Sequence, residues 1–443
     1  MINIYSIGGY EESGRNMTAI EVGDEAIIID MGFYLPAIID FEEGGGDKRT
    51  LNRDSLIKLG AVPNDNVIKH ISKNVRAIVL GHAHLDHIGA VPILAPHYNA
   101  PIIGTPYTIE VLKAMIADDK LTIKNKLTAI NLNSKINISK NMSIELLNVT
   151  HSTLQTAMVA VHTKEGTVLY ANDFKFDNHP VIGSKSNTKR LKELGLENVK
   201  ALIVDSLYSN YDQKTPSEKV AREMLKDVML GTENSENIII ATTFASHIAR
   251  LTSLVDFGKA LNRKILILGR SMQKYIHAAE KLKLANFAGT EMISYANKIK
   301  RRLNHIKKEE RHKYLIICTG GQGEPSSVMN KMLTNKIPFE FLSGDHVIFS
   351  NKIIPVNPNL INRKNIEERL KKKDVRIFKD IHVSGHASRE DIRDLIAIAK
   401  PQHIIPGHGN HELYNGLIEL CTDMGYDIKK SVHVLHDGHK LEL

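Results

Sequence analysis

Four residues of metal-binding type within six positions constrain this chain more than any other feature. The aliphatic run Val75 to Leu80 is typical of a buried strand, and it is followed by His82, Ala83, His84, Leu85, Asp86 and His87. Imidazole and carboxylate groups are the usual ligands of zinc and manganese. Because side chains alternate in extended backbone, His82 and His84 should point to the same side. Asp86 and His87 precede a helix expected from Ile88 onward, so they can face a second metal.

The ordinary alternative for this segment is a turn with surface histidines. A chance HxHxDH pattern is expected in only roughly a few per thousand chains of this length. The motif therefore predicts a metal site rather than an exposed turn.

This motif fills only part of two coordination shells, so further ligands must come from distant segments. His151 and Asp173 each follow a short aliphatic run, and the two oxygens of Asp173 are suited to bridge cations about 3.5–4 Å apart. His408 lies between Gly407 and Gly409, and such glycines let a side chain approach a centre closely. Taken singly, residues of this kind are more often ordinary hydrogen-bonded groups. Together with the motif, they are candidate ligands.

Size and composition favour a two-domain globular protein. The chain has 443 residues, which exceeds the usual limit of one hydrophobic core, and 42% hydrophobic with 24% charged residues is typical of a globular protein. The net charge of +8 favours a polyanionic partner such as nucleic acid, although many lysine-rich proteins carry such charge for solubility alone. Cys318 and Cys421 form neither a disulfide framework nor a CxxC pair.

No membrane or export signal is recognisable in the sequence. The N-terminus lacks a basic stretch followed by a long apolar segment, and no apolar run approaches the length of a membrane span. We therefore expect a cytoplasmic protein without a membrane partner.

The pattern of strands and helices divides the chain into three segments. Residues 1–209 alternate short β-like runs with loops, and several runs end next to Asp or His. Residues 210–377 alternate helical patterns with buried-strand runs, which is typical of a parallel α/β unit. Residues 378–443 return to strand ends that carry histidines. The expected organisation is an α/β fold in which 210–377 is inserted between the two parts of one domain.

The residues also resemble a known family. His82 to His87, with His151, Asp173 and His408, resemble the metallo-β-lactamase hydrolases, and Asp205, His386 and His408 stand where the nucleic-acid-processing β-CASP branch places its own motifs. The resemblance narrows to the RNase J family over nearly the whole chain. The supporting stretches are Ile7 to Gly9, Gly14 to Thr18, Asp173 to Asp177, Ile317 to Pro325 and His382 to His386. The family fold is an αββα sandwich with an inserted α/β β-CASP domain.

The resemblance implies a role for each matching position. His82, His84 and His151 would hold one metal, Asp86, His87 and His408 the other, and Asp173 would bridge them. Asp30 would orient the ligand loop. His386, supported by Asp205, would protonate the departing 3′ oxygen, with Asp86 also counted among the catalytic residues. The implied cofactors are two divalent ions, Zn²⁺ or Mn²⁺, and the implied substrate is RNA, cleaved to leave 5′-phosphate products.

A second implied site would bind the 5′ end of the substrate. The turn formed by His382, Val383, Ser384, Gly385, His386, Ala387 and Ser388 offers hydroxyl and backbone N–H groups to a phosphate. In the family the comparable turn holds the 5′-terminal phosphate and supports 5′→3′ exonuclease digestion. Phe244 and Ser246 would add base stacking and a phosphate contact. Strand-end packing and a helix N-cap are equally ordinary explanations of these two residues.

The sequence departs from the family pattern in two places. The chain ends soon after His408, so we expect a short form without the C-terminal domain through which bacterial members pair; a homodimer through another surface and RNA-decay helicase partners both stay open. His411 also follows His408 closely and competes with it as a ligand.

Three other functions compete with the exonuclease. These are an endoribonuclease of the same branch, a small-molecule hydrolase that uses the same metals, and a non-catalytic RNA-binding scaffold. The inserted segment argues against the second, and the complete ligand set argues against the third.

Overall fold

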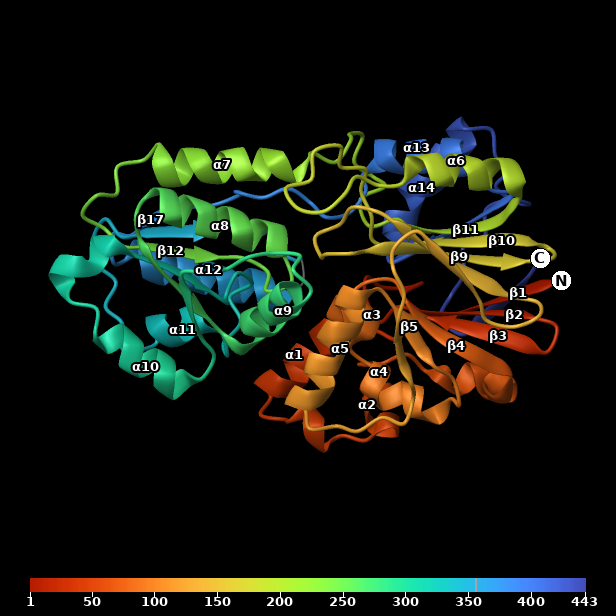
Figure 1. Cartoon of the computed structure of the whole chain (residues 1–443), viewed down its shortest axis with the longest axis horizontal. Coiled ribbons are helices and arrows are strands. Elements are labelled where there is room, and N and C mark those ends of the chain that lie inside the picture. The colour runs from red at the N-terminus through yellow and green to blue at the C-terminus, as the bar shows by residue number, and fades with distance from the viewer. Residues whose placement is uncertain (355–356) are drawn as a thin grey trace. The chain divides into compact units, whose positions relative to one another are not determined.

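The computed structural model describes residues 1–354 and 357–443, which form two compact units. The first unit comprises Met1–Asn178, Ser184–Thr215 and Gly385–Leu443, and the second comprises His179–Gly183 and Pro216–Ser384 (Figure 1). The second unit is thus inserted into the first. The junctions at Thr215 and Ser384 lie a few residues after the limits at 209 and 377 expected from the sequence.

The first unit is built on two mixed sheets. In spatial order the seven-stranded sheet contains β19 (His439–Glu442), β1 (Ile2–Gly8), β2 (Met17–Val22), β3 (Glu25–Ile29), β4 (Val75–Leu80), β5 (Ile102–Gly104) and β6 (Leu127–Ala129). The six-stranded sheet contains β18 (His403–Gly407), β11 (Val199–Asp205), β10 (Gly166–Ala171), β9 (Ala157–Thr163), β8 (Ser143–Asn148) and β7 (Ser134–Asn137).

Helices cover the outer faces of both sheets (Figure 1). The helices of this unit are α1 (Leu35–Glu43), α2 (Arg53–Lys58), α3 (Leu85–Ile88), α4 (Val91–Leu94), α5 (Pro106–Asp118), α6 (Thr188–Glu197), α13 (Arg389–Ala399) and α14 (His411–Asp423), with 3-10 turns at Lys48–Thr50, Asp65–Asn74 and Ala95–His97. The layers are therefore helix, sheet, sheet and helix, and the expected αββα sandwich is confirmed.

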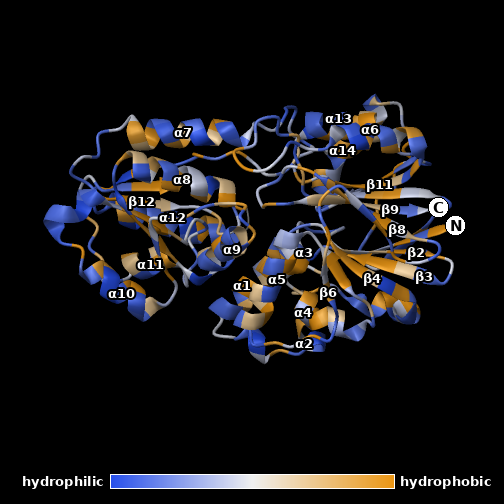
Figure 2. Cartoon of the chain, viewed as in Figure 1, coloured by the Kyte–Doolittle hydropathy of each residue, from blue (hydrophilic) through white to orange (hydrophobic). Residues whose placement is uncertain are grey.

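Successive side chains of a strand point to opposite faces of the sheet. Here each face packs against its own hydrophobic core, so the strands are apolar on both faces. Along β9, Val159 and Val161 point into the core between the two sheets, where they join residues of the other sheet such as Ile27 and Val79. The neighbouring Met158 and Ala160 point the other way, into a second core formed with α6, α13 and α14. Figure 2 shows the result as hydrophobic strands between helices of mixed colour.

The second unit is a fully parallel sheet flanked by helices. Its strand order is β14 (Thr290–Ile293), β13 (Lys264–Leu268), β15 (Tyr314–Cys318), β12 (Ile239–Thr242), β16 (His346–Phe349) and β17 (Arg376–Phe378). Its helices are α7 (Glu218–Leu230), α8 (Ile248–Ala260), α9 (Arg270–Lys281), α10 (Ala296–Asn304), α11 (Val328–Leu333) and α12 (Asn357–Lys371), with a 3-10 turn at Lys308–Lys313. Buried side chains of α10, α11 and α12 share one core with the sheet.

This parallel unit agrees with the helix and strand alternation expected for residues 210–377. Lys264–Leu268 and Tyr314–Cys318 are two of its buried strands. In the part of the chain that the structure describes, none of the helices combines the length and apolar character needed to cross a membrane.

Candidate metal centre

The ends of neighbouring strands place the candidate residues at one edge of the first unit. Asp30 follows β3 and His82 follows β4, and these two strands are parallel partners. Asp173 follows β10, Asp205 ends β11 and His408 follows β18, and these three strands are also parallel neighbours. Because parallel strands end at the same edge of a sheet, residues far apart in the chain become neighbours.

The motif segment differs from its expected local structure in one respect. The helix expected from Ile88 onward instead begins at Leu85, so Asp86 and His87 lie inside the short helix α3. His84 keeps extended backbone angles at the start of this helix. The helical turn separates Asp86 and His87 from His82 and His84. The two pairs therefore belong to two different groups of candidate metal ligands.

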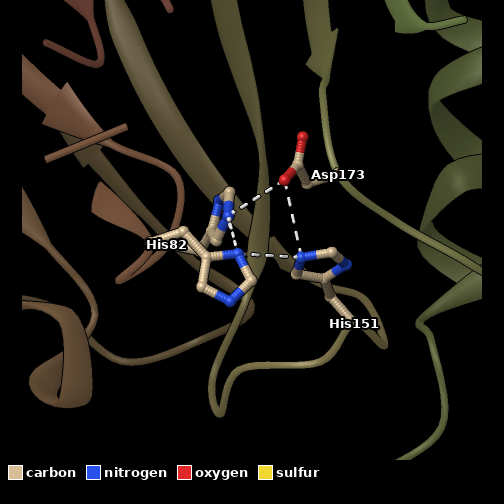
Figure 3. Close-up of side chains that lie close together, drawn as sticks. His82, His151 and Asp173 are labelled. Atoms are coloured by element: carbon tan, nitrogen blue, oxygen red, sulfur yellow. Dashed lines mark hydrogen bonds and ion pairs between the residues drawn. The ribbon is translucent and has the colours of Figure 1, made fainter. Parts of the chain in front are cut away.

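The first group brings three imidazoles and one carboxylate together. His82 Nε2 lies 3.1 Å from His84 Nδ1, and His151 Nε2 lies 3.2 Å from the same atom. Asp173 Oδ2 lies 3.2 Å from His82 Nε2 and 3.4 Å from His151 Nε2. Figure 3 shows His82, His151 and Asp173 pointing toward one another. These four side chains satisfy the spacing of a metal-ligand set.

The second group contains Asp86, His87 and His408. His87 Nε2 lies 3.6 Å from Asp86 Oδ2 and 3.3 Å from Asp173 Oδ1. His408 lies 3.7 Å from Asp173 Oδ1 through its Nδ1 and 3.9 Å from Asp86 Oδ2 through its Nε2. The two oxygens of Asp173 therefore face different groups, Oδ2 the first and Oδ1 the second.

The side chains present fit divalent cations. Neither oxygen of Asp173 has a hydrogen-bond partner among the described residues, although the side chain is only 1% exposed. A buried carboxylate without such partners is costly unless a cation compensates it. Burial lowers the pKa of His84 to about 3 and that of His151 well below its usual value, so both imidazoles are in the neutral form that binds metals.

Contacts behind the clusters orient the histidine rings. His87 donates from Nδ1 to Asp30 Oδ2 at 2.7 Å, and Asp30 Oδ1 also accepts the Gly81 N–H at 2.8 Å. His151 donates from Nδ1 to the Gly385 carbonyl at 2.6 Å. In both rings Nε2 is the nitrogen that faces the cluster, as in metal sites where an outer partner orients the ring.

Asn16 also lies in the site, although its sequence context predicts no role for it. Its Nδ2 lies 3.0 Å from the Asp86 carbonyl and 3.1 Å from His87 Nε2. Its Oδ1 lies 3.1 Å from His408 Nδ1 and 3.3 Å from Asn172 Nδ2. A single asparagine near glycines belongs to no recognisable local motif. Only its place within Gly14 to Thr18, one of the stretches that resemble the family, pointed to it.

His386 falls in a third group of potential ligands, with Asp173 and His408, but it also contacts a carboxylate outside the other two groups. Its Nδ1 is 2.8 Å from Asp205 Oδ2, and its ring stacks on His408 with centroids 5.4 Å apart. Asp205 is fully buried and accepts the Leu207 N–H as well. Burial alone lowers the pKa of His386, but the carboxylates of Asp173 and Asp205 outweigh it and raise the pKa to about 9.

Three of these residues have left-handed backbone. Asp30, Asp173 and His408 have φ of 61°, 57° and 54°. For residues other than glycine this conformation costs on the order of 1–3 kcal/mol and persists where the surroundings impose it, as at functional sites. The strain shared by three residues of one cluster is consistent with a site built for ligands.

The turn expected to hold a 5′ phosphate is divided between the two units. Gly385, His386, Ala387 and Ser388 belong to the first unit, and His382, Val383 and Ser384 to the second. Thr215 Oγ1 accepts the Ser388 N–H at 2.9 Å and donates to the His386 carbonyl at 2.8 Å. This threonine fixes the backbone beside His386.

Phe244 and Ser246 lie in the second unit. The half-buried Phe244 ring is 6.5 Å from the His382 ring between centroids, which brings these two predicted substrate contacts together. Ser246 is buried, and the N-cap of α8 is His247 without a side-chain cap. Ser246 is therefore not the side-chain N-cap of this helix.

His411 does not join the candidate ligands. It begins α14, and its ring lies 4.9 Å from that of His436 between centroids. Among the described residues it belongs to no metal-ligand set, whereas His408 does.

Sequence comparisons divide the chain as the fold does. Residues 10–197 match the metallo-beta-lactamase superfamily, residues 236–368 the beta-CASP domain of ribonuclease J, and residues 374–433 the Zn-dependent metallo-hydrolase RNA specificity domain. The protein named ribonuclease J from Methanocaldococcus jannaschii is 42% identical over 442 residues, which cover 99% of this chain and 98% of that protein. The chain belongs to the ribonuclease J family.

Other relatives of the ribonuclease J family agree with this assignment. The ribonuclease J of Pyrococcus abyssi is 42% identical, covering 100% of this chain and 97% of its own length. The ribonuclease J of Helicobacter pylori is 29% identical over 100% of this chain, and the match covers 61% of the Helicobacter protein. A crystal structure of a protein of unknown function from Enterococcus faecalis has a TM-score of 0.64 at 16% identity, with both chains fully covered, and supports the fold alone. The fold and the His/Asp cluster together indicate divalent-metal binding.

Proposed function

We propose that this member of the ribonuclease J family is a metal-dependent ribonuclease that hydrolyses RNA phosphodiesters and leaves 5′-phosphate products. The observation that carries the proposal is the convergence of seven His and Asp side chains from distant segments on two adjoining groups. The match to an RNA specificity domain and the names of the relatives support RNA as the substrate.

The proposed cofactors are two divalent cations. His82, His84 and His151 would hold one, Asp86, His87 and His408 the other, and Asp173 would contact both. When bound, two such ions lower the pKa of water toward neutrality and neutralise charge on the phosphate. Histidine and aspartate suit zinc and manganese alike, and we propose zinc because imidazoles outnumber carboxylates in the set.

His386 is the proposed general acid. Its Nδ1 contacts the buried carboxylate of Asp205, so Nε2 is the ring atom available to donate a proton to the departing 3′ oxygen. Asp205 holds the ring in this orientation through the same hydrogen bond. A positioned imidazole of this kind contributes typically 10²–10⁴-fold to rate.

We also propose that digestion runs 5′→3′ from a 5′-monophosphate bound by residues 382–388. Arg250 Nη1 and Ser350 Oγ both donate to the Ile381 carbonyl, at 3.1 and 2.8 Å, and so anchor the backbone directly before His382. Phe244 beside His382 offers a ring on which a base can stack.

An end-labelled RNA tests direction and end preference together. RNAs labelled at the 3′ end and carrying a 5′-monophosphate, 5′-triphosphate or 5′-hydroxyl would be digested with zinc or manganese, with and without a chelator. We expect mononucleotide release, fastest from the monophosphate and abolished by the chelator. Equal rates on all three ends would contradict the 5′-phosphate pocket. Discrete internal fragments would instead support the endoribonuclease.

A further inference from the structure

A basic hollow in the second unit lies outside the metal centre and has no role in the proposed chemistry. It is an open depression of about 680 Å³, lined mainly by the end of β14, the loop after it and helix α10, with Gln273 contributed by α9. Its size lies in the range of sites for small organic ligands, roughly 300–1,000 Å³. It can therefore accept one or two nucleotides of a single strand.

The positive charge of the hollow follows from the way α10 packs. Ile299 and Leu303 lie four positions apart and are both buried in the core beneath the helix. This contact turns Lys298, Arg301 and Arg302 together to the side that lines the hollow. Figure 2 shows both hydrophobic and hydrophilic residues along α10.

Two of these three cations have no acidic partner in the described part of the chain. Arg302 Nε lies 2.8 Å from a carboxylate oxygen of Glu291, which also lines the hollow. Lys298 and Arg301 form no ion pair with any carboxylate within residues 1–354 and 357–443. After the internal pairing, the hollow retains a net positive charge.

An exposed aromatic ring stands beside these cations. Tyr295 is 62% exposed, and Lys298 Nζ lies 5.9 Å from its ring centre. The Oγ of Ser294, another lining residue, is buried and has no hydrogen-bond partner among the described residues. If these basic residues served only to keep the helix face solvated, neither the concave surface nor the exposed tyrosine would be needed. Cations flanking an exposed ring are the arrangement with which proteins hold single-stranded nucleic acid.

We propose that this hollow binds a segment of single-stranded RNA, with a base stacked on Tyr295 and phosphates contacting Lys298 and Arg301. The inference rests on the proposed function, because it names a further contact for the same substrate. It differs from the 5′-phosphate site in its residues and in its chemistry. It would contact internal phosphates and the face of a base rather than the 5′ end of the strand.

The phosphate contacts are tested with the double variant Lys298→Ala/Arg301→Ala. Dissociation constants of a fluorescent single-stranded RNA would be measured over a salt series with metal-loaded protein in a His386→Ala background, in which cleavage is slow. Two lost contacts on a single strand should weaken binding and reduce the slope of log K against log salt by about 1.4. The matched control Lys429→Ala/Lys430→Ala removes the same charge from an exposed part of the first unit and should retain the parent slope. Equal losses in both double variants would overturn the inference.

The stacking contact is tested separately with Tyr295→Ala and Tyr295→Phe. Loss of the ring should raise the dissociation constant about fivefold or more without changing the salt slope, whereas phenylalanine should retain parent binding. Parent-like binding by Tyr295→Ala would contradict the stacking role.

Cleavage assays distinguish failure of this inference from failure of the proposed function. If the parent cleaves RNA while all hollow variants bind RNA as the parent does, the hollow is not an RNA site and the proposed function stands. If the parent neither cleaves nor binds RNA, both proposals fail. A polyglutamate peptide that binds more tightly than RNA, and loses this binding in the double variant, would assign the hollow to acidic protein segments instead.

Discussion

At the scale of single residues, Asp173 and His386 lie side by side but have different surroundings. Asp173 is buried with left-handed backbone and two carboxylate oxygens that lack hydrogen-bond partners among the described residues. His386 has its Nδ1 occupied by Asp205. The first arrangement suits a cation ligand, whereas the second suits a proton donor. Substitutions at the two positions should therefore have different effects.

We predict that His386→Ala lowers the rate of RNA cleavage about 10²–10⁴-fold while metal content stays at the parent level. Asp173→Asn is the matched contrast, because it keeps the shape of the side chain but removes the charge that faces both groups, and it should lower metal content as well as rate. Rates on 5′-monophosphorylated RNA and metal per chain by elemental analysis provide the two measurements. Loss of metal in His386→Ala would rule out a purely acid role.

At the scale of elements, close contact between loops fixes the short helix α3. Gly32 donates its N–H to the Asn16 carbonyl, and the Phe33 N–H contacts the Leu85 carbonyl at the start of α3. A Cβ at position 32 would lie 1.6 Å from the Asp86 carbonyl oxygen, so no side chain fits there without moving the backbone of α3. The position of Asp86 and His87 thus depends on a glycine in another loop.

We predict that Gly32→Ala displaces α3 and lowers both metal content and the melting temperature. Gly104→Ala is the control, because that Cβ would meet its neighbours at an ordinary 3.5 Å although the residue is also buried. Elemental analysis and thermal unfolding would be compared for the two variants. Full metal content in Gly32→Ala would show that the loop can adapt.

A second element-scale contact joins β8, β9 and α6. Glu145 on β8 accepts from Arg190 Nε of α6 at 2.8 Å and lies 3.0 Å from His162 Nε2 of β9. Burial raises the pKa of Glu145, but His162 and Arg190 outweigh it and lower the pKa to about 2. A lowered pKa in the folded state means that the ionised group stabilises the fold above its unfolded pKa of about 4.3.

We predict that Glu145→Gln lowers the free energy of unfolding at pH 7 by about 1–3 kcal/mol. The difference from the parent should shrink as the pH falls from about 4.3 toward 2, since the parent carboxylate is then protonated as well. Denaturant unfolding of both proteins at several pH values measures this. A difference that does not change with pH would assign the loss to packing rather than charge.

At the scale of the whole molecule, all the ligands of the candidate metal centre belong to the first unit. Its candidate ligands come from residues 82–173 and from His408, on both sides of the inserted second unit. A cation held by both parts binds only the folded arrangement, because the unfolded chain does not bring them together. Metal binding and folding of the first unit should therefore be linked.

We predict that removal of metal by a chelator lowers the stability of the first unit by about 4 kcal/mol, the value for a ligand present at roughly 1,000 times its dissociation constant. Hydrogen exchange should accelerate in the strand ends at Asp30, His82, Asp173 and His408, and much less in the parallel sheet of the second unit. Re-addition of zinc or manganese should restore protection. Uniform acceleration in both units would contradict a metal effect confined to the first.

The sequence by itself determined several of the buried strands, the order of the segments and the motif from His82 to His87. Aliphatic runs specify buried strands because local periodicity decides which side chains lie on each face, and four candidate ligands fall within six consecutive positions whatever the rest of the chain does. The resemblance to family motifs identified His151, Asp173 and His408 as well, but their meeting required the sheet order β18, β11, β10, β9 and β8.

Only the tertiary structure decided the surroundings of those residues. The contacts of Asn16 with His87 and His408, the left-handed backbone of Asp173 and the hollow beside α10 have no local pattern. Each arises from packing between segments that are distant in the sequence, and the energy of that packing belongs to the whole fold rather than to any one stretch of it.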